Sequence, residues 1–309
     1  MRPPAALLAL LLGGAAARGD QLFVVVSAPR SGTEWLRLML GGHPRICCDG
    51  EILLRLGRQR RPGGRGVRAA LGAFAAGAAP GFDDVLRPCR KAGAGARGFK
   101  WFDGQGGATV AAPTDALGNL SAWRRATGAK LIVLERQGLA KLVSDRLKHD
   151  HAVPTHCRDS ECAARVARHR VTLDPPLLEA QLDASVHRFG ALLTWARAQA
   201  AFGDVLYVAY QDLAADPDRE LRRAYRFLGV DDGWRTNASV LTKSVQTPLS
   251  EIVSNYGAVR EALARTKWAG EVRPAPRPVA KPVPQPAPRP RGRGGRRNKG
   301  RPVLSRARE

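Results

Sequence analysis

The stretch Leu22 to Glu51, LFVVVSAPRSGTEWLRLMLGGHPRICCDGE, decides the fold. It opens with a continuous apolar and mostly β-branched run over 22–26, as expected of a strand buried on both faces of a parallel sheet. A turn of small residues follows at 27–32, and the apolar spacing over 35–40 then predicts a helix. A strand, a tight turn and a helix in this order direct free backbone N–H groups at one point, where an anion is favoured. The sequence therefore predicts a phosphate-binding turn.

This turn differs from the phosphate loop of ATP and GTP hydrolases. Their pattern, GxxxxGK[ST], does not occur in the sequence. Residues 29–36, PRSGTEWL, instead resemble the phosphosulfate-binding loop of sulfotransferases, P-[KR]-[ST]-G-[ST]-x-[WFY]-L. That family uses 3′-phosphoadenosine-5′-phosphosulfate (PAPS). The resemblance implies that the cofactor's 5′-phosphosulfate is bound by Arg30, Ser31, Gly32, Thr33, Glu34 and Trp35.

Glu34 departs from the family pattern, because many members carry a second hydroxyl at this position. A carboxylate aimed into an anion site would repel the ligand. We therefore expect the Glu34 side chain to turn outward on the first turn of the helix.

A second strand-to-helix junction supports the same interpretation. The apolar run 130–135 predicts a buried strand, and the run 139–148 predicts the helix that follows. In sulfotransferases an Arg at the end of this strand and a Ser eight residues later bind the 3′-phosphate, and Arg136 and Ser144 stand at that spacing. A guanidinium suits a phosphate bidentately, and the hydroxyl adds a donor. Gln137-Gly138 replaces a proline that family members often carry here.

The connection 41–51 resembles a family element, hP.i...gE, whose carboxylate serves as the catalytic base in related enzymes. Glu51 is therefore the candidate base, and the alternative is an ordinary solvated acid. The arginine-rich segment 55–68 is either solvated surface or a binding site for an anionic acceptor. A gfK element follows at 98–100, and in the family its lysine, here Lys100, can face the site.

The resemblance covers about residues 22–265. The block 210–230 resembles a structural Y-E-D-L to FLG segment of the family. Residues 241–265 resemble the carboxyl-terminal element that lies over the nucleotide, which makes Lys243 and Asn255 candidate cofactor contacts.

Further periodic segments complete the expected fold. Strands are predicted at 98–102 and 205–210. Helices are predicted at 114–127, over about seven turns from Asp174, and from Pro217 to Gly229. Strands alternating with helices predict an α/β fold, here a three-layer P-loop-like domain with a central parallel sheet flanked by helices, over residues 20–268.

The two ends of the chain differ from this domain. Residues 1–19 resemble a signal peptide or a short signal anchor, which places the protein in the secretory pathway, in the Golgi lumen or secreted. Sequons at Asn119 and Asn237 are then candidates for glycosylation. The segment 269–309 holds 12 of the 50 basic residues but only two of the 27 acidic ones, and from 271 onward it has nine prolines. It is expected to be a disordered tail that binds polyanions weakly.

The five cysteines suit an oxidising compartment. Cys157 and Cys162 lie in a polar loop, and a disulfide between them is preferred over a zinc site with the histidines nearby. One of Cys47 and Cys48 could bridge to Cys89, and the sequence does not choose between them.

Together these features predict an enzyme that moves the sulfuryl group of PAPS to an acceptor hydroxyl, expected on a carbohydrate, and releases adenosine 3′,5′-bisphosphate. Glu51 and Arg30 are the predicted catalytic residues, without a metal and without specific binding of nucleic acid. The alternative is an inactive, secreted polyanion-binding protein on the same scaffold. A nucleotide-dependent kinase is a more distant alternative.

Overall fold

The computed structural model describes residues 20–52, 71, 74–75, 93–102, 115–151, 153, 157, 159–202, 204–235 and 248–272. The predictions for the leader at 1–19, for the basic segment 55–68, for Lys243 and for the tail beyond Val272 fall outside these residues.

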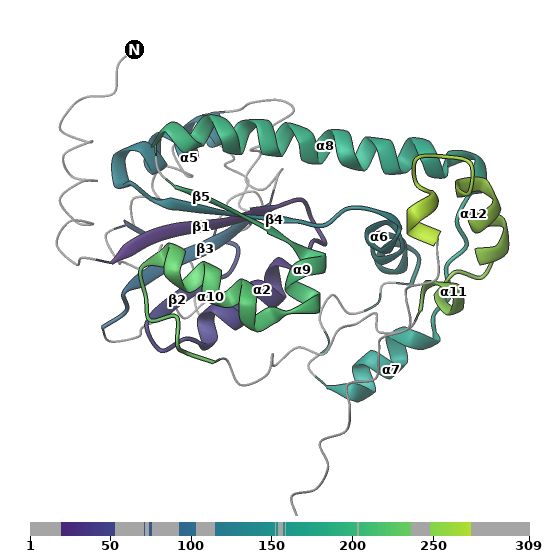
Figure 1. The fold of residues 1–309 in the computed structure, drawn as a ribbon, viewed down its shortest axis with the longest axis horizontal. Helices are drawn as coiled ribbons and strands as arrows, with labels where there is room; N and C mark the ends of the chain where they lie inside the picture. Colours follow the sequence, from purple (N-terminus) through teal and green to yellow (C-terminus); the bar gives the residue numbers. More distant parts are fainter. Residues whose placement is uncertain are drawn as a thin grey trace, which may run out of the picture. The chain divides into compact units, whose positions relative to one another are not determined.

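A sheet of five strands in the order β2-β3-β1-β4-β5 forms the centre of the molecule, and every neighbouring pair is parallel (Figure 1). The strands are β1 (Gln21–Ser27), β2 (Ile46–Asp49), β3 (Ala96–Phe102), β4 (Lys130–Glu135) and β5 (Val205–Ala209). All five therefore end at the same edge, where ligands bind in open α/β sheets. The predicted fold class is confirmed.

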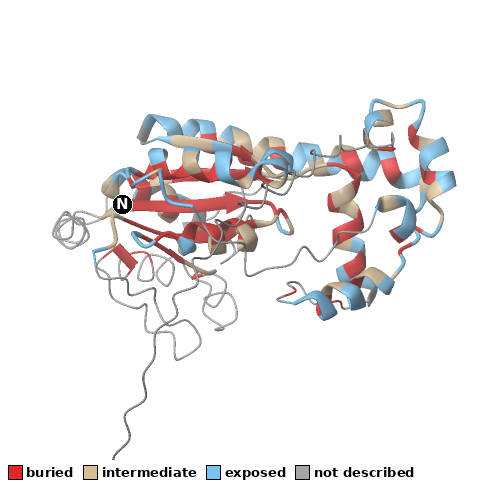
Figure 2. Ribbon diagram, turned by 60° about the horizontal axis from the view of Figure 1, so that its bottom comes forward, coloured by how far each residue is buried: buried red, intermediate tan, exposed pale blue. Residues whose placement is uncertain are grey.

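Helices cover both faces of this sheet, and alternate residues of β1 face the two layers. Leu22, Val24 and Val26 pack in one core with side chains of α5 and α8, whereas Phe23 and Val25 pack in another with α2, α9 and α10. Strands β1 to β4 are almost wholly buried between these layers, whereas the edge strand β5 is only partly buried (Figure 2). The helices are α2 (Thr33–Gly42), α5 (Asp115–Thr127), α8 (Leu178–Gln199), α9 (Tyr210–Ala215) and α10 (Pro217–Leu228).

A third core lies beyond the sheet, around α6, and it includes the last described residues. Its side chains come from the first turns of α8 and from α6 (Leu139–His151), α7 (Ser160–Arg168), α11 (Leu249–Ile252), α12 (Tyr256–Leu263) and η4 (Ala269–Val272). The short helix η2 (Pro175–Leu177), which precedes α8, has no buried residue. A further short helix, η3 (Ala200–Phe202), follows α8. The packed part of the chain thus extends to Val272, four residues into the segment whose composition suggests a tail.

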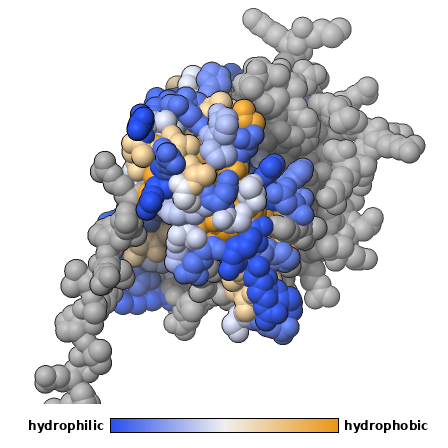
Figure 3. Space-filling model, turned by 90° about the vertical axis from the view of Figure 1, so that its right-hand side faces the viewer, coloured by the Kyte–Doolittle hydropathy of each residue, from blue (hydrophilic) through white to orange (hydrophobic). Residues whose placement is uncertain are grey.

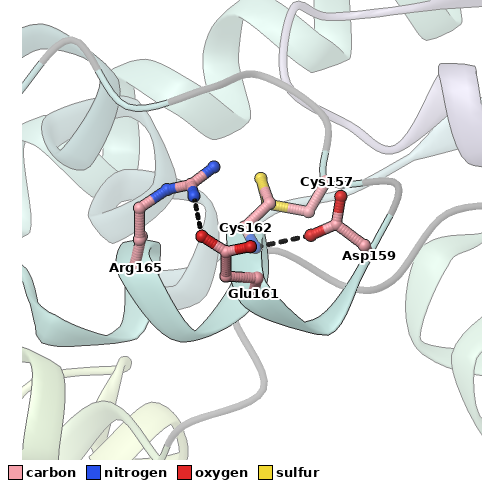
Figure 4. Close-up of a disulfide and its surroundings, with 5 residues drawn as sticks. All are labelled: Cys157, Asp159, Glu161, Cys162 and Arg165. Atoms are coloured by element: carbon pink, nitrogen blue, oxygen red, sulfur yellow. Dashed lines mark hydrogen bonds and ion pairs between the residues drawn. A yellow bond between two sulfur atoms is a disulfide. The ribbon is translucent and has the colours of Figure 1, made fainter.

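The disulfide predicted between Cys157 and Cys162 is present, with 5.3 Å between the two Cα atoms (Figure 4). Asp159 caps α7 beside it by accepting a hydrogen bond from the backbone N–H of Cys162 at 2.7 Å. Of the adjacent pair, Cys47 is disulfide-bonded and Cys48 is a buried free thiol, which settles a choice that the sequence left open. No group of three His, Cys, Asp or Glu suited to a metal occurs among the described residues.

Several short elements were not predicted, β2 and α7 among them. β2 lies where the sequence suggested only a connection, since four residues give too short a pattern to recognise. α7 lies in a segment read as a polar loop, although Asp159 is a good N-cap and Cys162 and Val166 share one buried face. Short elements of this kind depend on tertiary packing more than on their own periodicity.

None of the described helices is both long and apolar enough to cross a membrane. Figure 3 shows the side of the molecule that lies at the right of Figure 1, where hydrophilic side chains cover most of the described surface. The hydrophobic areas between them are small, so this described face has no extended apolar patch.

Gly98 lies in the middle of the sheet and offers a test of its packing. It pairs in register with Phe23, and a Cβ on Gly98 would lie 2.4 Å from two atoms of that buried ring. Gly98→Ala should therefore lower the free energy of unfolding by about 2 kcal/mol in a urea titration. Gly118→Ala is the control, because its Cβ would meet open space on α5 and should stabilise by about 1 kcal/mol. Equal effects of the two substitutions would contradict the pairing of Gly98 with Phe23.

Candidate functional site

The turn after β1 has an unusual backbone. Gly32, the N-cap of α2, has a φ of +87°, and Arg30 has a φ of +65°, the one positive value of a non-glycine among the described residues. This conformation costs a residue with a side chain about 1 kcal/mol or more, and such outliers often occur at functional sites. A Cβ on Gly32 would lie only 2.7 Å from Cε2 of Tyr210, so both the conformation and the space require glycine.

The turn faces the end of β4, and two arginines meet there. Arg136 donates from Nη1 to the backbone carbonyl of Arg30 at 3.1 Å. Burial lowers the pKa of Arg30; the charge of Asp145 opposes this shift, and the charge of Arg136 adds to it. Burial likewise lowers the pKa of Arg136. Both guanidinium groups nevertheless stay charged at neutral pH, so two like charges share a partly buried position.

Three buried polar atoms at this position have no hydrogen-bond partner among the described residues: Nε of Arg30, Oγ of Ser31 and Nε of Arg136. Buried polar groups are normally paired, so each unpaired one needs an explanation. Two cations and three unpaired atoms that can each donate, around one turn, have the chemistry of an oxyanion site.

Tyr210 contacts both sides of this anion site, although its sequence context indicated only a structural role. Its ring lies under the guanidinium of Arg136, with 4.3 Å from Cζ to the ring centroid. It also meets Trp35 edge to face, with 5.9 Å between centroids, and packs against Gly32. A cation–π contact of this kind orients a guanidinium without using its N–H donors. An aromatic residue at the carboxyl end of a strand was the available sequence signal.

Ser144, predicted beside Arg136, is buried on α6 with 4% of its surface exposed. Its neighbour Asp145 accepts a hydrogen bond from Lys141 at 2.6 Å, and the charge of Asp145 reaches both Arg30 and Arg136. This part of α6 therefore lies near both arginines, and the contact of Ser144 with a 3′-phosphate stays a prediction.

Glu34 does not turn outward, which corrects the expectation for this residue. Its side chain is only 16% exposed, and its two oxygens contact Arg37 and the ammonium group of Lys100, at 2.5 Å in each case. Burial by itself would raise the pKa of Glu34, but the hydrogen bonds and charges of Arg37 and Lys100 outweigh burial and lower it to about 2. Glu34 is thus an ionised member of a charge cluster, and both of its oxygens are engaged away from the anion site.

Lys100 joins this cluster to the candidate base. It lies on β3 with its side chain 5% exposed, and its Nζ is 2.9 Å from a carboxylate oxygen of Glu51 as well as 2.5 Å from Glu34. Residues from α2, β3 and the end of β2 therefore meet around one ammonium group. The gfK pattern pointed to this lysine, but only the structure shows that it holds Glu51.

The turn separates two chemically different regions. On the β4 side Arg30 meets Arg136, and on the β3 side Glu34 meets Lys100 and Glu51. The first region is cationic with unpaired donors, and the second holds a carboxylate beside a buried ammonium group. An anion can bind in the first while a proton is accepted in the second.

Asn255 has other partners in the fold. Its amide accepts from the backbone N–H of Leu173 at 3.1 Å and donates to the carbonyl of the same residue at 2.7 Å, which ties the start of α12 to the segment before η2. Its predicted contact with the cofactor stays a prediction. Lys243 lies outside the described residues.

No family model matches the sequence, and no curated protein matches it. The sequence has several similar solved structures, and two of them are sulfotransferases. One is the mouse sulfotransferase SULT7A1 complexed with PAP, with 16% identity and a TM-score of 0.36 over 84% of this chain and 82% of that chain. The other is a sulfotransferase from Alicyclobacillus acidocaldarius, with 17% identity and a TM-score of 0.35 over 80% and 93%. At these scores neither structure establishes a function, which has to come from the site itself.

The low pKa of Glu34 predicts how stability depends on pH. Because the pKa falls from its ordinary 4.5 to about 2 in the folded protein, the carboxylate stabilises the fold above pH 4.5, and this stabilisation is lost as the pH falls to about 2. Over that window the free energy of unfolding of the wild type should drop more steeply than that of Glu34→Gln, as measured by urea unfolding at several pH values. The exposed Glu261→Gln should behave like the wild type. Parallel curves for the wild type and Glu34→Gln would show that the cluster does not form.

Proposed function

We propose that this protein is a sulfotransferase that binds PAPS and transfers its sulfuryl group to an acceptor hydroxyl on a carbohydrate. The observation that carries the proposal is the meeting of Arg30 and Arg136, each with an unpaired buried Nε, where two parallel strands pass into helices. One turn alone would suit any phosphate. A second basic junction beside it suits a nucleotide that carries anionic groups at two positions.

The residues present fit this cofactor. Arg30, Ser31 and the backbone N–H groups at the start of α2 would hold the 5′-phosphosulfate, while Arg136 and Ser144 would hold the 3′-phosphate. When bound, PAPS supplies an activated sulfuryl group. Arg30 would stabilise the negative charge that develops on the bridging oxygen as the sulfur–oxygen bond to the phosphate breaks.

Glu51 would accept the proton of the acceptor hydroxyl as the new oxygen–sulfur bond forms. Lys100 holds this carboxylate at 2.9 Å, so the base has a fixed position at the carboxyl edge of the sheet. Reaction by this route is catalysis through positioning and electrostatics, as in phosphoryl transfer. The released nucleotide would be adenosine 3′,5′-bisphosphate.

The secretory pathway is the proposed location. Its support is the apolar leader in the sequence together with the disulfide-bonded Cys47 and the Cys157–Cys162 bridge, since disulfides persist in oxidising compartments. The rival proposal of an inactive polyanion-binding protein was motivated in part by Glu34, whose carboxylate would spoil an anion site. Because Glu34 is paired with Arg37 and Lys100 instead, its carboxylate no longer argues for an inactive protein.

Nucleotide binding gives the first test. Adenosine 3′,5′-bisphosphate should raise the melting temperature of the wild type more than ATP or adenosine 5′-monophosphate does. Arg136→Ala should weaken the bisphosphate at least about tenfold and leave the 5′-monophosphate nearly unchanged, because a charged hydrogen bond to the 3′-phosphate is lost. Arg188→Ala, an exposed arginine on α8, is the charge-matched control. A wild type that prefers ATP would favour a kinase and refute the proposal.

Transfer of labelled sulfate from PAPS to a panel of glycans gives the second test. Glu51→Gln should lower kcat by about a hundredfold or more without changing the affinity for adenosine 3′,5′-bisphosphate, because only the proton acceptor is removed. Arg30→Ala should lower both kcat and the affinity for adenosine 3′,5′-bisphosphate. Full activity in both variants would refute the site assignment. A wild type without transfer but with tight, salt-sensitive glycan binding would support the inactive alternative.

A further inference from the structure

Glu271, near the end of the described chain, caps the helix that follows Arg136. Its Oε2 accepts a hydrogen bond from the backbone N–H of Leu139 at 3.0 Å, across a sequence separation of 132 residues. The first turn of α6 has no acidic residue of its own, and Gly138 before it has no side chain that could cap. A carboxylate at this position satisfies a free N–H group and interacts favourably with the helix dipole. Glu271, from a distant segment, thus supplies the capping acceptor that the local sequence lacks.

Gly138 is shaped to receive this carboxylate. It has a φ of +82°, and a Cβ there would lie 2.5 Å from both oxygens of Glu271. No other residue type leaves this space in this conformation. Gly138 lacks the conformational restriction of a proline, but it leaves room for the carboxylate of Glu271.

Glu271 itself is rigidly supported. The backbone N–H of Glu271 donates to the carbonyl of Trp268 at 2.9 Å, and the indole of Trp268 donates to Asp183 on α8 at 3.0 Å. On the other side Val272 is buried, and its carbonyl accepts from the hydroxyl of Tyr256 at 3.3 Å. The cap is therefore held by α8 and α12.

We propose that Glu271 is a positioning residue for recognition of the 3′-phosphate. This inference rests on the proposed function and deepens it. The capped N–H group lies between the two predicted ligands, three residues after Arg136 and five before Ser144. Without the cap, Gly138 would leave the segment 136–138 free to adopt many conformations, and binding would have to order it. Glu271 acts through the backbone and need not touch the nucleotide.

Dissociation constants for two nucleotides, adenosine 3′,5′-bisphosphate and adenosine 5′-monophosphate, test this role. Glu271→Ala should weaken the bisphosphate about tenfold and the monophosphate hardly at all, because only the 3′-phosphate contacts lose their preorganisation. Glu271→Gln should fall between the wild type and Glu271→Ala, since its amide oxygen can still accept the hydrogen bond but carries no charge. The exposed Glu261→Ala on α12 is the control and should leave both affinities unchanged.

The outcomes separate this inference from the proposed function. If the wild type does not prefer the bisphosphate, the 3′-phosphate site and the role of Glu271 are both refuted. If the wild type prefers it and both Glu271 variants keep the full preference, the proposed function stands and the role of Glu271 is overturned. An equal loss of affinity for both nucleotides would also overturn the role of Glu271. Such a result would indicate a general loss of structure, which weakens the bisphosphate and the monophosphate alike. Should Glu271→Ala not fold, Glu271→Gln decides alone, with an expected loss of about threefold.

Discussion

Gly32 and the ring of Tyr210 are packed so closely that the turn between β1 and α2 can adopt few other backbone conformations. With a Cβ excluded at 2.7 Å, the backbone of the turn lies directly on the aromatic ring, and Arg30 is held in a left-handed conformation beside it. The other contact of the same ring, with Arg136, brings the end of β4 to this turn. One aromatic side chain thereby fixes the relative position of two strand-to-helix junctions that are about a hundred residues apart in the sequence.

This arrangement has an electrostatic consequence. Two arginines with buried, unpaired Nε atoms form a position where positive charge is not compensated by a contacting carboxylate in the described structure. Four residues after Arg30, the carboxylate of Glu34 pairs with Arg37 and Lys100 and compensates part of their positive charge. Lys100 is then shared with Glu51, so the carboxylate assigned to proton transfer is held within a nearly neutral cluster. In the proposed mechanism the anion binds on one side of the turn and the proton is accepted on the other, so that neither region cancels the charge of the other.

The local pattern of the sequence was enough to predict the two junctions and the α/β fold. Apolar runs at 22–26 and 130–135, each followed by a turn and a helical pattern, define strands and helices through neighbours in the chain. The direction of Glu34 could not be predicted in this way, because one of its two partners, Lys100, is 66 residues away. The roles of Tyr210 and Glu271 were missed for the same reason. β2 was missed because an edge strand of four residues has almost no pattern of its own.

The partners that escaped prediction have one property in common. Each is a distant side chain that restrains a local motif: Tyr210 restrains the first turn, Lys100 restrains Glu51, and Glu271 restrains the second turn. A motif shared with a family specifies which ligand atoms can be contacted, because donor types and spacing lie within it. How firmly those donors are held depends on residues elsewhere, since glycine-containing turns are flexible unless something packs against them. A departure from a family motif, such as Gly138 or Glu34, is therefore best understood by identifying its long-range partner, which here is Glu271 in one case and Lys100 in the other.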